Sequence, residues 1–316
     1  MQPRTAAGSG QQSTAQRSLW RTAVAAWTLL RPRQWTKNLL VLAAPLFAAE
    51  LTRPDVLART ILATVAFCLV SSAGYVYNDL HDAELDRAHP LKRSRPIAAG
   101  EVKPRAAMAI ALVLAVAAFA VGYFAAPWVA ALVLIYAVLM LFYSNWGRAQ
   151  APLDVFIIAI GFVLRAIAGA AASHVPMSPW FLALTLLLAV MLGFGKRRAE
   201  LSLLGEDFGM ARNSLRVYSV AMLDQLLSVL AASIIVLYAI YAVSISGRLN
   251  SSDMILTWPL VLVGVLRYLQ ISHTADRPPD ELLVSDRVIL VLVVGFAGIA
   301  AVVLHYHTHI LQPITI

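Results

Sequence analysis

Charged residues are scarce in this chain. Only 13% of its 316 residues are Asp, Glu, Lys or Arg, whereas 60% are apolar. A soluble domain carries about twice that charged fraction, so the composition excludes an ordinary water-soluble globular protein. Cysteine is nearly absent, and the single Cys68 excludes an intrachain disulfide. Cys68 lies inside an apolar run, as is typical of a small residue in a packed core.

Several common site motifs are also missing. The chain contains no G-x-x-x-x-G-K-[ST], no G-x-G-x-x-G and no C-x-x-C. Nucleotide-binding loops, dinucleotide folds and zinc ribbons therefore have no support, and no nucleic-acid partner is expected. The polar segment 1–18 lacks the apolar stretch of a signal peptide and is expected to be disordered.

Long apolar runs are what this sequence has in abundance. Runs of about twenty apolar residues are long enough to cross the hydrocarbon core of a bilayer as helices. They predict an all-α polytopic membrane protein in which residues 36–316 form one transmembrane domain. About nine spans are expected, the first of them short, near residues 36–50, 55–78, 104–125, 128–146, 153–173, 179–196, 219–245, 254–273 and 286–306.

The segment 19–35 has a different pattern. Trp20, Val24 and Trp27 are spaced i, i+4, i+7, and Arg17 and Arg21 lie nearby. Aromatic and apolar residues on one helical face beside basic residues favour an amphipathic helix that lies in the membrane surface. A simple extension of the first span is the alternative interpretation.

Basic residues are distributed unevenly among the connections. The N-terminal segment and the loops after the second and sixth spans are rich in Lys and Arg, whereas the loops after spans one, three, five and seven hold only Arg53, Arg59 and Arg248. The positive-inside rule then places the N-terminus in the cytoplasm and the C-terminus outside. We expect an integral plasma-membrane protein whose cytoplasmic face attracts anionic lipids or substrates.

Acidic residues gather on the same face, first in the segment NDLHDAELD after the second span. On a continuing helix Asp79, Asp82 and Asp86 are spaced i, i+3, i+7 and share one face, with Asn78 on its flank. Mg²⁺ prefers oxygen ligands and is usually held by one or two carboxylates plus substrate phosphates. We predict that these four residues hold Mg²⁺ and through it a diphosphate, with the aspartates as catalytic residues. A solvated helix end is the alternative.

A basic loop, HPLKRSRPIAAG, follows the aspartates. Its prolines and glycine indicate a loop and not a helix. Lys92, Arg93 and Arg95 in this loop suit a diphosphate that is bound by metal on one side and by basic side chains on the other. Charge that serves only to orient the membrane protein explains some of these bases but not the aspartates.

A second charged segment, GFGKRRAELSLLGED, lies at the end of the sixth span. The two charged span ends are expected to face each other and to frame one polar cavity open to the cytoplasm. The candidate substrate-binding residues of this second segment are Lys196, Arg197, Arg198, Glu200, Glu206 and Asp207.

Four isolated residues complete the candidates. Tyr143 and Arg148, at the end of the fourth span, could contact substrate phosphate or anchor the helix at the interface. Lys37 in RPRQWTKN is a candidate phosphate ligand by its position at the start of the first span. Arg165 lies within the fifth span, where an arginine must pair or line a cavity, and we expect a structural or pocket-lining role.

Taken together, these motifs resemble the UbiA superfamily of intramembrane prenyltransferases. The resemblance rests on NDLHDAELD followed by RPIAAG, on the LDV…LRAIAGA segment, on the nine spans and on the second charged motif. It covers nearly the whole chain from Arg31 onward. It implies a helical bundle with a cavity that opens laterally to lipid, and Mg²⁺ bound at acidic motifs. The second motif departs from the family's aspartate-rich repeat, which puts a second metal in doubt and favours more anionic substrates.

Within that superfamily, RPRQWTKNLLV and both charged motifs most resemble a branch that acts on two phosphate-bearing substrates. The resemblance implies transfer of 5-phosphoribose from phosphoribosyl pyrophosphate to a polyprenyl phosphate such as decaprenyl phosphate, for synthesis of cell-wall arabinan. Transfer of a prenyl group to an aromatic or glycerol-phosphate acceptor is one alternative, and transport of an anionic lipid is another. The sequence leaves open whether the chain forms a homo-oligomer.

Overall fold

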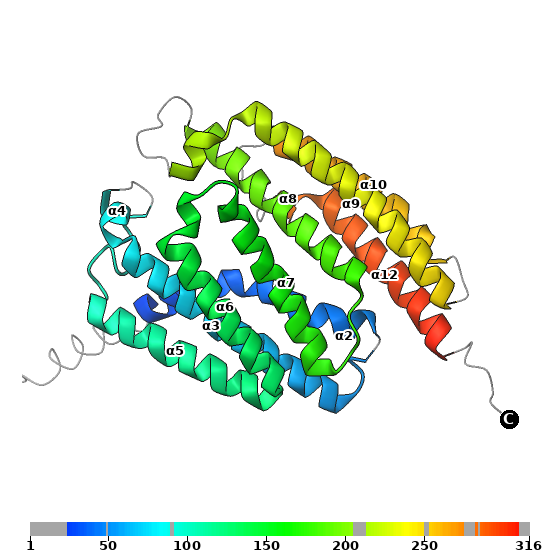
Figure 1. The fold of residues 1–316 in the computed structure, drawn as a ribbon, viewed down its shortest axis with the longest axis horizontal. Helices are drawn as coiled ribbons and strands as arrows, with labels where there is room; N and C mark the ends of the chain where they lie inside the picture. Colours follow the sequence, from blue (N-terminus) through cyan, green and yellow to red (C-terminus); the bar gives the residue numbers. More distant parts are fainter. Residues whose placement is uncertain are drawn as a thin grey trace, which may run out of the picture.

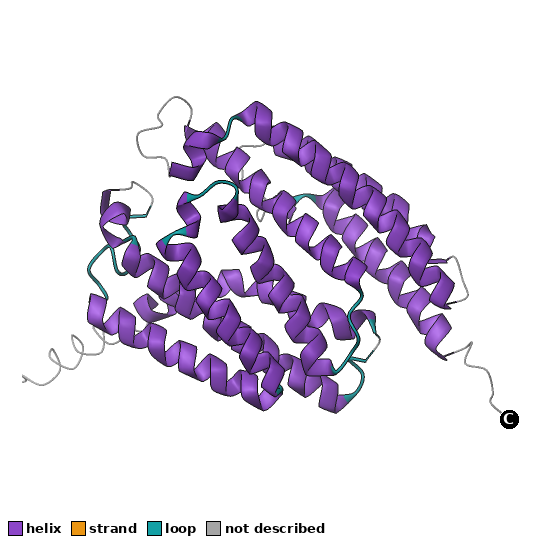
Figure 2. Cartoon of the chain, in the orientation of Figure 1, coloured by secondary structure: helices purple, strands orange, loops and turns teal. Residues whose placement is uncertain are grey.

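The chain folds into a bundle of helices that run alternately up and down (Figure 1). A computed structural model describes residues 24–48, 50–88, 92–204, 213–249, 253–274, 282–283 and 285–309, with backbone alone for 204, 213, 245–249 and 304–309. Within these residues the regular secondary structure is helical and contains no strand (Figure 2). The prediction of an all-α fold is therefore confirmed.

Eight long helices build the bundle within the described residues. They are α3 (Pro54–His81), α5 (Pro104–Ala125), α6 (Pro127–Asn145), α7 (Leu153–Ser173), α8 (Pro179–Leu204), α9 (Val220–Leu249), α10 (Trp258–Thr274) and α12 (Arg287–His309). Short elements lie between and beside them: η1 (Pro32–Leu42), α2 (Ala43–Phe47), α4 (Ala83–Ala88), η2 (Gly147–Ala149), η4 (Asn213–Val217) and η5 (Asp253–Thr257).

Seven helices of the described chain are long and apolar enough to cross a membrane. The expected count of nine is not confirmed. The predicted first span, 36–50, is a 3₁₀ helix, η1, followed by the five-residue α2 instead of one continuous α-helix. The apolar part of α12 that the structure describes, Arg287–Val303, is shorter than the other spans.

The core consists of two halves that meet at α7. Buried side chains of α3, α5 and α6 form one half together with Leu164, Ala168 and Ala172 of α7. Within this half, Phe67 of α3 packs against Tyr136 of α6 with ring centroids 5.5 Å apart. Buried side chains of α8, α9, α10 and α12 form the second half together with Val155 and Ala159 of α7. This central position explains why α7 is the most buried of the candidate spans.

The outer faces of the bundle carry large apolar side chains, as a lipid environment requires. Phe124 and Trp128, at the junction of α5 and α6, are 77% and 75% exposed. Residues 24–30 are helical, with Val24 and Trp27 exposed and with Ala25 and Leu29 buried. This helix is shorter than the expected segment 19–35, because η1 begins at Pro32. Its position in the membrane surface stays a prediction.

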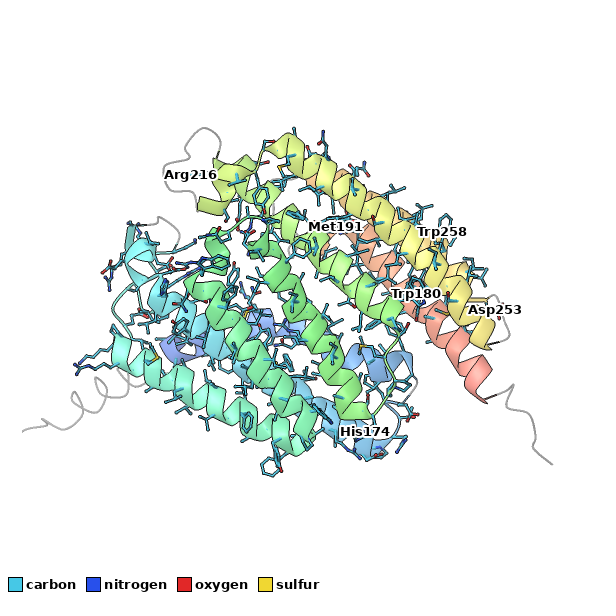
Figure 3. All side chains as sticks on the ribbon, in the orientation of Figure 1. His174, Trp180, Met191, Arg216, Asp253 and Trp258 are labelled. Atoms are coloured by element: carbon cyan, nitrogen blue, oxygen red, sulfur yellow. The ribbon has the colours of Figure 1, made fainter. Side chains whose placement is uncertain are left out.

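The charged span ends lie together at one end of the bundle. The C-terminal ends of α3, α6 and α8 and the N-terminal ends of α7 and α9 meet at the upper left of Figure 1. Arg216 of η4 marks this end, and His174, which follows α7, marks the opposite end (Figure 3). Side chains that are far apart in sequence are thereby brought to one layer.

Candidate functional site

The three aspartates are buried where α3 gives way to α4. Asp79, Asp82 and Asp86 are 3%, 6% and 4% exposed, so they are not a solvated helix end. The expected continuous helix is interrupted, because α3 ends at His81 and Asp82 is its C-cap. The backbone N–H of Asp82 still donates to the Asn78 carbonyl at 2.9 Å, and that of Asp86 donates to the Asp82 carbonyl at 2.8 Å. The helical spacing of the aspartates therefore persists across the interruption.

Each buried aspartate has an arginine partner. Arg95 Nη1 donates to Asp79 Oδ1 at 3.0 Å and to Asp86 Oδ2 at 2.7 Å. Arg31 Nη2 also donates to Asp79 Oδ1, and Arg148 Nη1 donates to Asp82 Oδ1. Buried carboxylates are tolerated when they are paired and hydrogen-bonded. We call this group of six side chains the acid–arginine layer.

The basic loop after α4 places Arg95 in this layer. Its backbone turns are closed by hydrogen bonds from Arg95 N to the Lys92 carbonyl at 2.9 Å and from Val102 N to the Pro96 carbonyl at 3.1 Å. Ile97, at 1% exposure, anchors the loop in the apolar cluster formed with α3 and α5. Of the three predicted bases, Arg95 pairs with the aspartates, whereas Arg93 is exposed and Lys92 is half-buried.

Arg31 is a member of the layer that the sequence did not identify. In the sequence, Arg31 is one of the basic residues of the N-terminal segment, whose excess of Lys and Arg predicts only the orientation of the chain in the membrane. Its backbone has φ 50° and ψ 60°, a left-handed conformation that is uncommon for a residue other than glycine. This conformation turns the chain between the helix of residues 24–30 and η1. Its guanidinium also lies over the Tyr75 ring, 5.1 Å from the centroid. No local sequence signal marks the pairing with Asp79.

Arg148 reaches the layer from the other side of the bundle. Ser214 Oγ of η4 donates to the Arg148 backbone carbonyl at 3.0 Å and so ties η2 to η4. The second oxygen of Asp82 accepts a hydrogen bond from Asn78 Nδ2 at 3.2 Å. The structure thus brings the predicted residues Asn78 and Arg148 together at Asp82.

The second charged segment has carboxylate partners of its own. Arg197 is buried, and its Nε and Nη1 donate to Asp154 Oδ2 at 2.7 Å and to Glu200 Oε2 at 2.6 Å. Tyr218 OH donates to Asp154 Oδ1 at 3.2 Å. Burial and the adjacent Asp154 carboxylate raise the pKa of the Tyr218 phenol above its usual value, so that the hydroxyl keeps its proton as a donor. This cluster fixes the junction of α7, α8 and α9.

Arg198 and Lys196 of this segment form no ion pair with Asp79, Asp82 or Asp86 in the described part of the chain. Arg198 is buried and donates to Asp224 Oδ1 and, at 2.6 Å, to the Ser272 carbonyl. Lys196 is exposed, and Tyr143 at the end of α6 is half-buried. Glu206 and Asp207 lie outside the described residues. Contact of this segment with substrate phosphate stays a prediction.

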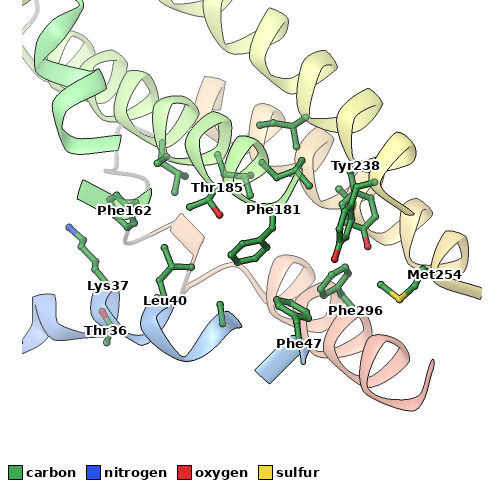
Figure 4. Close-up of a pocket in the computed structure, with 18 residues that line it drawn as sticks. Thr36, Lys37, Leu40, Phe47, Phe162, Phe181, Thr185, Tyr238, Met254 and Phe296 are labelled. Atoms are coloured by element: carbon green, nitrogen blue, oxygen red, sulfur yellow. The ribbon is translucent and has the colours of Figure 1, made fainter. Parts of the chain in front are cut away.

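An apolar cavity of about 540 Å³ lies deeper in the bundle, between η1 and α2 on one side and helices α7–α10 and α12 on the other. Lys37 and Thr36 lie at one end of it, and Met254 and Phe296 lie toward the other (Figure 4). Lys37 is the one charged side chain among the described residues that line the cavity. The structure therefore places Lys37 on the cavity wall and not among the aspartates.

The three aspartates and the adjacent Asn78 carry oxygen ligands of the kind that a hard divalent cation binds, but their arrangement is set by the arginines. Asn78, Asp79, Asp82 and Asp86 offer carboxylate and amide oxygens, which are ligands that Mg²⁺ accepts. In the part of the chain that the structure describes, no three Asp, Glu, His or Cys side chains are grouped closely enough to hold a metal ion. The carboxylates point toward arginines instead. A cation and an arginine compete for the same oxygens, and an anionic substrate offers the arginines an alternative partner.

Sequence comparisons identify relatives of this chain. Residues 38–195 match the UbiA prenyltransferase family. The decaprenyl-phosphate phosphoribosyltransferase of Mycolicibacterium smegmatis is 36% identical over 293 residues, which cover 88% of this chain and 91% of that protein. The enzyme of the same name from Mycobacterium tuberculosis is 34% identical over 272 residues, which cover 84% of this chain and 90% of that protein.

The fold has a solved counterpart. A UbiA homologue from Archaeoglobus fulgidus, bound to DMAPP and Mg²⁺, superposes with a TM-score of 0.69 and covers 90% of this chain and 97% of its own. The two sequences are 18% identical, so this likeness concerns the fold. The matches in sequence, together with this fold, show that the chain is a membrane-embedded transferase that belongs to the UbiA prenyltransferase family.

Proposed function

We propose that this chain is a Mg²⁺-dependent phosphoribosyltransferase. It transfers 5-phosphoribose from phosphoribosyl pyrophosphate to a polyprenyl phosphate and releases pyrophosphate. The observation that carries the proposal is the acid–arginine layer, in which three buried carboxylates pair with three arginines, together with the apolar cavity deeper in the bundle. Such a layer suits a polyanionic donor, and the cavity suits a lipid acceptor. The names of the mycobacterial relatives support this pair of substrates.

Asn78, Asp79, Asp82 and Asp86 are the residues that would hold Mg²⁺. When bound there, the cation supplies neutralisation of the charge on the donor's diphosphate. A Mg²⁺-bound homologue of the same fold supports this part of the proposal.

The arginines of the layer bind and orient the donor. Arg31, Arg95 and Arg148 each carry a planar guanidinium that can donate two parallel hydrogen bonds to phosphate oxygens. Donors fixed in advance around the diphosphate stabilise the negative charge that develops on the departing pyrophosphate. Because three arginines share this task, loss of one of them should slow the reaction while the carboxylates that bind Mg²⁺ remain in place.

The acceptor supplies its own nucleophile. As the bond between ribose C1 and the diphosphate oxygen breaks, an oxygen of the lipid phosphate forms the new bond to C1. That phosphate is already an anion, so no general base is required. The protein's task is to hold two mutually repelling anions in line, and positioning of this kind can contribute a large part of the rate enhancement.

The polyprenyl chain occupies the apolar cavity and continues into the membrane. Apolar side chains such as Phe47, Phe181 and Phe296 line this space and offer a tail an environment like that of lipid (Figure 4). With the acid–arginine layer at the basic end of the bundle, the reaction takes place on the cytoplasmic side. The product then serves as a precursor of cell-wall arabinan.

A donor assay on the full-length protein in detergent tests the proposal. Labelled phosphoribosyl pyrophosphate with decaprenyl phosphate is expected to give a labelled lipid and one pyrophosphate for each transfer, with Mg²⁺ and not with EDTA. A labelled prenyl diphosphate offered with 4-hydroxybenzoate or glycerol phosphate is expected to give none. Prenyl transfer without phosphoribose transfer, or movement of lipid across a vesicle membrane without pyrophosphate release, would contradict the proposed reaction.

A further inference from the structure

η1 has a register that separates two rows of side chains. In a 3₁₀ helix residues i and i+3 lie above one another, and runs as long as the eleven residues of η1 are uncommon. Lys37, Leu40 and Ala43 follow this spacing, and all three line the apolar cavity. The row of Asn38 and Val41 is fully buried on another side. The 3₁₀ geometry therefore decides that Lys37 belongs to the cavity wall.

The buried row holds η1 in place. Asn38 Nδ2 donates to Ser71 Oγ of α3 at 3.2 Å, and Asn38 Oδ1 accepts from Arg165 Nε of α7 at 2.6 Å. Trp35 Nε1 donates to Ser72 Oγ of α3 at 3.0 Å. Hydrogen bonds on both sides of Lys37 thus fix the backbone that presents it. The head of the cavity, by which we mean its end at Thr36 and Lys37, is consequently preorganised.

Arg165 adds a second positive charge behind this segment. It is 4% exposed, and its guanidinium donates to Asn38, to the Gly161 carbonyl at 2.8 Å and to Tyr136 OH at 2.8 Å. Within the described chain no carboxylate lies within 4.0 Å of it, so its partners are neutral dipoles and rings. Phe162 lies 5.2 Å from the guanidinium carbon, measured to the ring centroid, and also lines the cavity. A buried charge without a counter-ion attracts an anion strongly in a low-dielectric interior.

The head of the cavity is close to the acid–arginine layer but distinct from it. Ser72, which anchors Trp35, precedes Asp79 by seven residues on α3, a rise of roughly 10 Å at the usual rise per residue. Lys37 therefore lies on the membrane side of the aspartates, where the polar layer meets the apolar cavity. An occupant with an anionic head at Lys37 and a linear apolar tail along Leu40 and Ala43 matches both the charge and the shape of this space.

We propose that the head of the cavity binds the phosphate of the lipid acceptor, with Lys37 as its direct ligand and with Arg165 as the buried charge that favours an anion there. This inference rests on the proposed function for the role of the lipid as acceptor. It assigns the donor to the acid–arginine layer and the acceptor to the row of Lys37. The occupant is a polyisoprenyl monophosphate, and the neutral polyprenol binds this site with lower affinity.

Binding of radiolabelled decaprenyl phosphate and of decaprenol to the purified full-length protein tests the assignment. We expect the wild type to prefer the phosphate at least tenfold, and Lys37→Met to lose that preference while it binds decaprenol as before. Lys37→Arg retains the charge and should retain most of the preference. Lys103→Met removes an exposed lysine outside the cavity and should change neither ligand. Equal binding of both lipids by the wild type would overturn the proposal.

A pair of tryptophan variants tests the register. Leu40→Trp fills the cavity row and should weaken binding of both lipids at least tenfold. Leu39→Trp places the same ring at a neighbouring position that is 55% exposed and does not line the cavity, and should bind both lipids normally. Equal effects of the two variants would contradict the two-row arrangement of η1.

Kinetics separates this inference from the proposed function. If both hold, Lys37→Met raises the apparent KM for decaprenyl phosphate at least tenfold and leaves that for phosphoribosyl pyrophosphate unchanged. A raised KM for the donor alone would overturn the acceptor assignment while the reaction itself stands. Preference for decaprenyl phosphate without any phosphoribose transfer would overturn the reaction and support the lipid-phosphate site.

Discussion

Arg148 and Asp82 lie 66 residues apart in the sequence and form a direct ion pair. The pair joins η2, between α6 and α7, to the junction of α3 and α4. Asn78 holds the other oxygen of the same carboxylate at 3.2 Å. Asp82 is therefore the point where two parts of the bundle are connected through charge, and it is also a residue that we propose to bind Mg²⁺.

Asp82→Ala tests this double role. We expect a folded protein whose phosphoribosyl transfer is near background, because the variant lacks a metal ligand and leaves Arg148 without its carboxylate. Turnover and the thermal midpoint of unfolding in detergent are the measurements. Glu84→Ala, on the exposed side of α4 two residues away, is the matched control and should retain activity. Turnover like that of the wild type in Asp82→Ala would remove Asp82 from the metal site.

Arg95 is expected to matter more than its neighbour Arg93. A single nitrogen of Arg95 contacts both Asp79 and Asp86, so Arg95→Met leaves two buried carboxylates without the cation that they share. Hydrogen bonds to charged groups contribute about 1.5–3 kcal/mol, which predicts donor binding weakened by about tenfold or more. Titration with phosphoribosyl pyrophosphate, followed by intrinsic fluorescence, measures the affinity. Arg93→Met, on an exposed side chain, should bind the donor within about twofold of the wild type.

Removal of Mg²⁺ should affect stability as well as turnover. A ligand that binds only the folded state raises the midpoint of thermal unfolding. We expect Mg²⁺ with phosphoribosyl pyrophosphate to raise the midpoint of the wild type, and EDTA to abolish that increase. Asp79→Asn and Asp86→Asn should show a smaller increase at the same concentrations. An increase of full size in both variants would place the metal elsewhere.

The long helices could be predicted closely from the sequence. The expected spans 104–125 and 153–173 coincide with α5 and α7, because long apolar runs there are bounded by Pro104 and by the polar His174. The all-α class and the placement of both charged motifs at one end of the bundle followed from the same runs. Asn78 and Arg148 were candidates from position alone, and the structure brings both to Asp82.

The sequence could not predict features that depend on contacts between distant segments. The apolar residues of 36–50 suggested a span, but the hydrogen bonds of Trp35 and Asn38 to α3 and α7 hold this segment as η1. The partners of Arg31 and Arg197 are likewise set by packing. Arg31 pairs with Asp79 and Arg197 pairs with Asp154, and in each pair the two residues come from different elements that are far apart in the sequence. A charged residue near a membrane boundary is visible in a sequence, whereas its partner is not.

Gly169 should tolerate no side chain. A Cβ at this position of α7 would lie 1.9 Å from the Val41 carbonyl oxygen of η1, so Gly169→Ala must push η1 away from α7. Overpacking of this kind typically costs about 1–3 kcal/mol. We expect a lower thermal midpoint and weaker binding of decaprenyl phosphate. Gly298→Ala in α12, where a Cβ meets nothing within 4 Å, should be neutral or stabilising in the same assays.

Asn38→Asp separates the electrostatic role of Arg165 from its structural role. The variant keeps the shape of the side chain and keeps an oxygen for Arg165 Nε, which the native residue meets at 2.6 Å. It removes the Nδ2 donor to Ser71 Oγ, so a lower thermal midpoint is expected whatever the role of Arg165. The new carboxylate supplies the counter-ion that Arg165 lacks in the described chain, so the positive potential at the head of the cavity falls. If Arg165 only braces η1, the affinities for the two lipids should change by the same factor.

If the charge of Arg165 attracts the lipid phosphate, Asn38→Asp should weaken binding of decaprenyl phosphate several-fold more than binding of decaprenol, because the neutralised pair no longer favours an anion. Decaprenol carries no charge and serves as the matched ligand, because its affinity reports any displacement of the cavity wall alone. Equal losses for both lipids would indicate a displaced η1, since a shift of the cavity wall weakens contacts with the apolar tail, which the two lipids share. The difference between the two ligands therefore measures the electrostatic part alone.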